Sequence, residues 1–206
     1  MNKNPIQSFI SEICPFGGDS FDFAHKILYL KEKNSIESFP KNFMYVLRDE
    51  IFNNVLSEFE SKPVRIFQAG AIETFKGLRW RIDSGWSDLI WGEYIKNNGG
   101  KLTVVDINID HLANSVFAAT QLGYEINAVH GDATDFISDE PYDIYYLDGG
   151  NDPQETLDQF NKIKDTDSIV LIDDYFVKGT LIETEDYDIT TYDICNGVSV
   201  IDLRAP

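Results

Sequence analysis

The chain has 206 residues, of which 43% are hydrophobic and 25% are charged. This length and composition favour one soluble α/β domain with a sizeable core. The formal net charge of −18 argues against nucleic acid as a partner, because the 17 basic residues are scattered along the chain. We expect a small-molecule substrate, and solubility alone remains the other explanation of the acidity.

Three further features of the sequence bear on its compartment. No run of about 18 apolar residues is present, so we expect no membrane span and no membrane partner. The N-terminal stretch MNKNPIQSFISEIC lacks the apolar core and the cleavage site of a signal peptide. Cys14 and Cys195 are too few and too far apart for a disulfide framework or a metal knuckle. Together these features predict a cytoplasmic protein.

Residues 1–62 are expected to form an N-terminal extension that ends in a helix. Proline and glycine interrupt residues 1–40, and apolar residues then recur at helical spacing over residues 41–60. Residues 63–206 form the predicted globular domain, in which short apolar runs alternate with helical stretches. The predicted strands are 64–69, 101–106, 125–130, 142–148 and 168–174, and the predicted helices are 87–97, 109–122 and 152–164.

The end of the chain has the pattern of a hairpin. The segments YDITTYDI and GVSVIDL alternate like strands, and Cys195-Asn196-Gly197 between them is a turn signal. Strands that alternate with helices predict a mostly parallel sheet with right-handed crossovers, to which this hairpin adds an antiparallel strand. Ligands bind such open sheets beyond the carboxyl ends of the parallel strands.

Polar residues follow the predicted parallel strands at these ends. Asp106 ends the second strand, where an acid can accept hydrogen bonds from both hydroxyls of a ribose. The spacing from Gly70 favours this role over that of an ordinary aspartate at a helix entry. The ends of the five strands carry Gln68 and Gly70, then Asp106, Asp132, Asp148, and the pair Asp173 and Asp174.

Five segments in this order resemble the class I S-adenosylmethionine-dependent methyltransferases over about residues 64–203: QAG, LTVVDIN, HGDATDF, YDIYYLDGG and IVLIDDYF. The resemblance implies a Rossmann-like methyltransferase fold with a mostly parallel seven-stranded sheet and an antiparallel C-terminal strand. It also implies S-adenosylmethionine as cofactor, with Gly70 near its methionine part, Asp106 on its ribose, and Asp132 with Ala133 beside its adenine. The full set of implied cofactor contacts is Gln68, Gly70, Ser87, Asp106, Ile107, Asp132, Ala133 and Asp148.

The fourth and fifth strand segments resemble a narrower subgroup, which includes macrolide-sugar O-methyltransferases and is related to the catechol and caffeoyl-coenzyme A O-methyltransferases. This resemblance implies that Asp148, Asp173 and Asp174 bind a divalent metal, for which Mg²⁺ suits the hard oxygen ligands. Asp148 and Asp173 would then be catalytic, because the metal lowers the pKa of a hydroxyl on a sugar, polyol or similar acceptor. A pair of acids at a solvated strand end is the alternative for Asp173 and Asp174.

The sequence departs from these families at three positions. Gln68 stands where the family has an acid, and Gly150 and Asn151 stand where the subgroup has Asp and His. These departures leave open a methyltransferase-like domain that binds a cofactor or a partner without catalysis. A nicotinamide-dependent oxidoreductase is a third possibility, but the GxGxxG fingerprint of dinucleotide sites is absent.

A long segment separates Gly70 from the helix predicted to begin at Ser87. In the family this connection is a short glycine turn, so we interpret residues 73–83 as an inserted lid over the cofactor and the acceptor. The candidate acceptor-binding residues are Arg79, Arg81, Trp86 and Tyr175. Ser87 is expected to cap the helix. The sequence leaves room for a homodimer and does not identify the acceptor.

Overall fold

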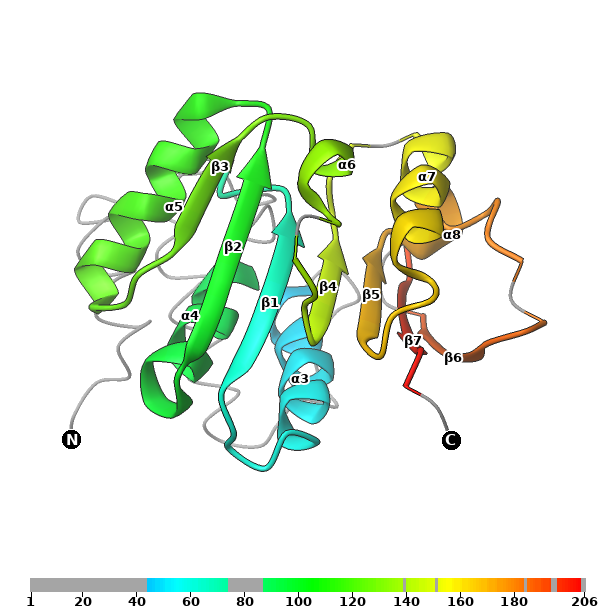
Figure 1. Ribbon diagram of the computed structural model, residues 1–206, viewed down its shortest axis with the longest axis horizontal. Coiled ribbons are helices and arrows are strands. Elements are labelled where there is room, and N and C mark those ends of the chain that lie inside the picture. Colours follow the sequence, from blue (N-terminus) through cyan, green and yellow to red (C-terminus); the bar gives the residue numbers. More distant parts are fainter. Residues whose placement is uncertain are drawn as a thin grey trace.

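The computed structural model of the chain describes residues 44–73, 87–138, 140–150, 152–183, 185–193 and 196–204. Strands and helices alternate through this part of the chain, as the sequence predicts (Figure 1). The strands are β1 (Val64–Ala69), β2 (Gly100–Asp106), β3 (Asn127–His130), β4 (Ile144–Leu147), β5 (Ile169–Asp173), β6 (Asp188–Tyr192) and β7 (Val198–Asp202). The helices are α3 (Met44–Ser57), α4 (Ser87–Asn98), α5 (Ile109–Leu122), α6 (Ala133–Phe136), α7 (Pro153–Ile163) and α8 (Tyr175–Lys178).

Within the described residues, the seven strands form one sheet in the order β3-β2-β1-β4-β5-β7-β6. The five strands from β1 to β5 run parallel, and β7 pairs antiparallel with both β5 and β6. This arrangement confirms the predicted mostly parallel sheet and its antiparallel strand near the C-terminus. The arrowheads of the parallel strands point to one edge of the sheet (Figure 1).

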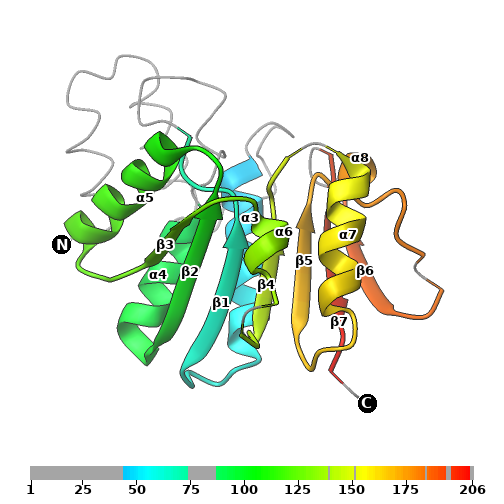
Figure 2. The same ribbon diagram turned by 45° about the horizontal axis from the view of Figure 1, so that its top comes forward.

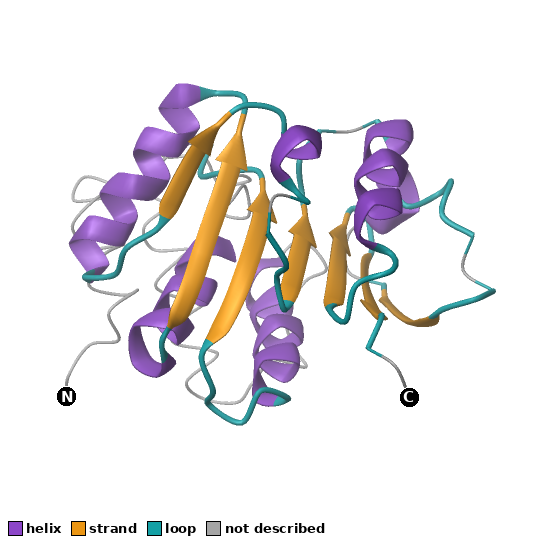
Figure 3. Ribbon diagram, viewed as in Figure 1, coloured by secondary structure: helices purple, strands orange, loops and turns teal. Residues whose placement is uncertain are grey.

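Helices cover both faces of this sheet (Figures 2 and 3). One apolar cluster joins α3, α4 and α5 to side chains such as Ile66 and Val104. The second cluster joins α6 and α7 to the alternate side chains of the same strands, such as Phe67 and Val105. Because neighbouring residues of a strand point to opposite faces, the near-continuous apolar strands supply both cores at once. Helix α3, predicted as the end of an extension, packs into the first of these cores.

Local signals set the ends of the longer helices. Helix α5 spans the predicted residues, and Gly123 ends it with a left-handed φ of 77° while its N–H donates to the Ala119 carbonyl. Asp152 caps α7 by accepting from the Gln154 N–H, directly before Pro153. The sequence missed α6 and α8, because helices of four residues show no helical periodicity. Across the described residues, no helix is long and apolar enough to cross a membrane.

Candidate functional site

The ends of β1, β2, β4 and β5 lie side by side at one edge of the sheet. In the register of these strands Ala69 pairs with both Val105 and Leu147, and Leu147 pairs with Ile172. The residues that follow in each strand are Gly70, Asp106, Asp148 and Asp173. Strand pairing therefore brings the predicted cofactor residues and two of the predicted metal ligands to the same level.

Gly70 begins the turn after β1 and approaches the end of β4 closely. Its φ of +94° is a conformation that L side chains rarely adopt. A Cβ atom at this position would lie 3.2 Å from the backbone oxygen of Asp148. The Gly70 N–H donates to the Val105 carbonyl over 2.8 Å. Glycine is therefore required for the chain to turn here between β2 and β4.

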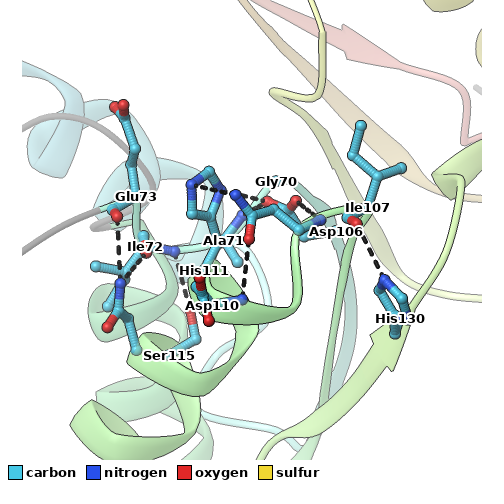
Figure 4. Close-up of polar contacts among 12 residues, drawn as sticks. Gly70, Ala71, Ile72, Glu73, Asp106, Ile107, Asp110, His111, Ser115 and His130 are labelled. Atoms are coloured by element: carbon cyan, nitrogen blue, oxygen red, sulfur yellow. Dashed lines mark hydrogen bonds and ion pairs between the residues drawn. The ribbon is translucent and has the colours of Figure 1, made fainter.

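The carboxylate of Asp106 accepts hydrogen bonds from the backbone that follows β1 and from the backbone that follows β2 (Figure 4). Its Oδ2 accepts from the Ala71 N–H at 2.9 Å and lies 3.3 Å from Nδ1 of His111. Its Oδ1 accepts from the Asn108 N–H at 2.7 Å. A carboxylate offers about four acceptor positions, so these three contacts leave Oδ1 able to accept another hydrogen bond. The geometry permits the ribose contact that the sequence analysis assigned to Asp106, although His111 was not foreseen there.

An apolar side chain projects beside this carboxylate. Ile107 is 74% exposed, and its backbone oxygen lies 3.0 Å from Nε2 of His130. Asp132 follows β3 and caps α6 through the Thr134 N–H at 2.8 Å, and Ala133 is buried beside it. The Gly131 N–H donates to the Asp106 carbonyl, which brings these two strand ends together. His130 therefore contacts the backbone directly after β2.

Gln68 and Ser87 are bonded to each other behind the turn. Both side chains are buried, and the Ser87 hydroxyl donates to Oε1 of Gln68 over 3.1 Å. The Gln68 amide in turn donates to the Gly70 carbonyl over 2.8 Å. The glutamine that replaces the family's acid thus ties the end of β1 to the first residue of α4. This arrangement gives both side chains hydrogen-bond partners within the protein, and their contact with the cofactor stays a prediction.

Replacing this glutamine by the family's acid tests the structural role. Gln68→Glu is expected to lower the free energy of unfolding by about 1–3 kcal/mol at neutral pH, because a carboxylate oxygen would face the Gly70 carbonyl. The loss should shrink at acid pH, where a protonated carboxyl can again donate. Urea unfolding at both pH values measures it, with Asn161→Asp, the same change from amide to acid at an exposed position of α7, as control. Unchanged stability together with tighter cofactor binding would instead assign Gln68 to the cofactor.

The carboxylates of Asp148, Asp173 and Asp174 come together, as the resemblance implied, with ligand atoms within 4.8 Å of one another. The ammonium of Lys178 lies among them. Its Nζ is 3.0 Å from Oδ1 and 3.3 Å from the backbone oxygen of Asp148, and 3.6 Å from Oδ2 of Asp174. Burial lowers the pKa of Lys178, but the three aspartate charges outweigh it and hold the pKa above its ordinary value. Lys178 is thus a cation in the middle of the predicted metal site.

Neutral donors engage both carboxylate oxygens of Asp173 and one of Asp174. The Tyr146 hydroxyl donates to Oδ2 of Asp173 over 3.0 Å, and the Asp174 N–H donates to its Oδ1. The Asn196 side chain donates to Oδ1 of Asp174. Mg²⁺ demands near-octahedral oxygen ligands at about 2.0–2.1 Å and keeps several waters. With Lys178 and these donors on the carboxylates, the residues do not fit the Mg²⁺ that the resemblance implied.

Of the four residues predicted to bind the acceptor, Tyr175 lies in the described part of the chain. Tyr175 packs against the second core cluster, next to Gly179 at the end of α8. Burial raises the pKa of its phenol. The predicted lid lies outside the described residues from residue 74 onward, and so do Arg79 and Arg81 within it. Trp86 and Asn151 also lie outside the described residues.

Comparison with solved structures gives several matches over nearly the whole chain. SAH-bound methyltransferase PaMTH1 of Podospora anserina is 14% identical with a TM-score of 0.57, over 100% of this chain and 97% of that one. Cofactor-bound Rv0187 from MTB is 14% identical with a TM-score of 0.58, over 100% of both chains. A mutant of MtNAS in complex with S-adenosylmethionine is 15% identical with a TM-score of 0.52, over 98% of this chain and 72% of that one.

This chain has a Rossmann-like methyltransferase fold. No protein-family model matches the chain, and no curated protein matches it. At 14–15% identity the structural likeness describes the fold, so the activity must be argued from the residues at the strand ends.

Proposed function

We propose that the protein is an S-adenosylmethionine-dependent methyltransferase that acts on an oxygen atom of a small molecule. One observation carries the proposal. The Asp106 carboxylate, with an acceptor position left on Oδ1, lies between the Gly70 turn and the exposed Ile107 side chain. The ribose of the cofactor needs an acceptor for its two hydroxyls, and its adenine needs an apolar surface. Its amino acid part needs a close approach of the backbone.

Each part of the cofactor then has a proposed position. Oδ1 of Asp106 accepts from the ribose, and Ile107 covers one face of the adenine. Asp132 and Ala133 flank its edge, at the end of β3 next to Asp106. The methionine part lies against the Gly70 turn, where the absence of a side chain allows close approach. This placement directs the sulfonium methyl group towards the end of β4.

The acceptor side of the site centres on Asp148. Methyl transfer forms a bond between the acceptor oxygen and the methyl carbon, breaks the bond from that carbon to sulfur, and releases the hydroxyl proton. Asp173 is 1% exposed and bonded to Tyr146, whereas the Asp148 side chain is 14% exposed. We therefore assign to Asp148 the orientation of the acceptor hydroxyl and the removal of its proton. In-line alignment of the oxygen with the methyl group supplies a large part of the acceleration.

Two measurements test this function. Calorimetry with S-adenosylhomocysteine should give saturable binding, and titration with NAD(H) should give none. Incubation with S-adenosylmethionine and a pool of hydroxylated metabolites, followed by mass spectrometry, should yield a product heavier by one methylene unit. Binding without any methylated product would favour the non-catalytic domain. Binding of NAD(H) alone would overturn the proposed cofactor.

A further inference from the structure

We infer that Lys178 is a built-in cation that takes the place of the divalent metal among Asp148, Asp173 and Asp174, and that it positions Asp148 in the site. The second half of this inference rests on the proposed methyl transfer, and the first half does not. Lys178 would act through Asp148 and is therefore a positioning residue.

The ammonium of Lys178 is buried against oxygen atoms of Asp148 and Asp174. Its nitrogen makes the contacts of 3.0 Å and 3.3 Å with Asp148 and 3.6 Å with Asp174, and the Lys178 side chain is 3% exposed. An ammonium has three donors, and burial is costly unless they are satisfied. Here the same oxygen atoms that would bind a metal satisfy the ammonium. The two cations therefore compete for one set of ligands.

An unusual backbone conformation brings Lys178 to these carboxylates. Asp174 has a left-handed conformation, with φ of 49° and ψ of 41°, although it is not a glycine. The turn begins α8 directly after β5, and one helical turn later the i,i+4 spacing returns Lys178 to Asp174. The Tyr175 and Phe176 N–H groups donate to the Gly197 and Asn196 carbonyls and anchor this turn to the start of β7. A conformation that is costly for aspartate is thus held by the surrounding structure.

Lys178 also holds Asp148 in position. Lys178 contacts both the carboxylate and the backbone oxygen of Asp148, and that backbone oxygen is the atom that a Cβ at Gly70 would approach most closely, at 3.2 Å. The ammonium therefore fixes the end of β4 against the turn that receives the methionine part of the cofactor. In the proposed reaction this orients the group that receives the acceptor proton.

The experiment measures binding of Mn²⁺ by calorimetry and by electron paramagnetic resonance, without cofactor or substrate. Wild-type protein should show no binding tighter than about millimolar, whereas Lys178→Ala should gain a site that is at least about tenfold tighter, because three carboxylates lose their counter-charge. Adding Asp173→Asn to that variant should abolish the gained site. Lys164→Ala, which removes an exposed lysine at the end of α7, is the matched control and should gain nothing.

Two results of the metal titrations would overturn the inference. The first is a stoichiometric Mn²⁺ site in the wild type that Asp173→Asn removes. The second is a folded Lys178 variant that gains no metal affinity. If Lys178→Ala does not fold, Lys178→Met, which keeps an apolar stem, replaces it, and the wild-type titration decides in any case. The metal measurements do not depend on S-adenosylhomocysteine, so failure of the proposed function remains distinguishable from failure of this inference.

The positioning role has its own readout. Methyl transfer by the wild type should be unchanged in EDTA. Lys178→Arg keeps the charge and should retain more of kcat than Lys178→Met, with little difference in KM for S-adenosylmethionine. A merely structural role would lower the amount of folded protein and leave the kcat of the folded fraction equal in the two variants. Loss of wild-type turnover in EDTA that Mg²⁺ restores would overturn the inference.

Discussion

Asp88→Asn is expected to raise the free energy of unfolding by about 4 kcal/mol at and above neutral pH, and to change it little near pH 4. Asp88 lies in the first turn of α4 and is 1% exposed. Within the described part of the chain, neither carboxylate oxygen has a hydrogen-bond partner. Burial raises its pKa from 3.8 to about 7, and the nearby Ser115 hydroxyl and Leu89 N–H offset this only in part.

The sign of the pH dependence follows from proton binding. Well below pH 4, Asp88 is protonated in both the folded and the unfolded chain. Between about pH 4 and pH 7 the folded protein retains the proton that the unfolded chain has released, so stability falls as pH rises. Above about pH 7 both states are ionised, and the penalty of the buried charge is constant. The asparagine variant lacks this dependence, because its side chain does not titrate.

Urea unfolding from pH 4 to pH 8 measures the effect. The wild type should lose stability over this interval relative to Asp88→Asn. Asp158→Asn, at an exposed position on α7, is the matched control and should follow the wild type. A variant that is less stable than the wild type at pH 8 would show that the Asp88 charge is compensated in the folded protein.

Asp106→Asn is expected to weaken binding of S-adenosylhomocysteine by roughly a hundredfold, which corresponds to about 3 kcal/mol. The carboxylate already accepts from Ala71 and Asn108 and retains one acceptor position on Oδ1. An asparagine has a single side-chain oxygen, so it cannot hold the turn and also bind a ribose hydroxyl. It also loses the charge that strengthens such bonds.

Calorimetry on folded protein measures this loss, with unfolding curves recorded beside it. Asp110→Asn is the matched control, because Asp110 is an exposed acid in the first turn of α5 near the same turn. It should bind the cofactor as the wild type does. An affinity within about twofold of the wild type for folded Asp106→Asn would remove Asp106 from the ribose contact.

Much of the fold could be read from local patterns. Strand β1 and helix α5 have their predicted bounds. Strands β3 and β4 lack some of the terminal residues that were predicted for them. The alternating hairpin at the end of the chain became β6 and β7. These features depend on residues close together in the sequence, such as the left-handed Gly123 and the Asp152 cap. The meeting of Asp148, Asp173 and Asp174 at the sheet edge was predictable for the same reason, because each lies at the end of a predicted parallel strand.

The contacts that define the site were not predictable in this way. Ser87 reaches Gln68 across 19 residues, and Lys178 reaches Asp148 across 30. Each pair depends on where a helix packs against the sheet. A signal for Lys178 was available in its spacing of four from Asp174, but only once α8 is known to be a helix.

The sequence by itself determined the alternation of strands and helices, the parallel sheet, and which acids stand at the ends of its strands. The periodicity of apolar residues, the helix caps and the turns are local features of the chain. They indicate helices and strands without reference to how these elements pack. Only the tertiary structure decided what those acids do. Burial left Asp88 without a hydrogen-bond partner in the described structure, whereas Asp106 gained backbone donors and Asp148 an ammonium. Burial and proximity depend on how distant segments pack, and they determine the charge and the partners of each carboxylate.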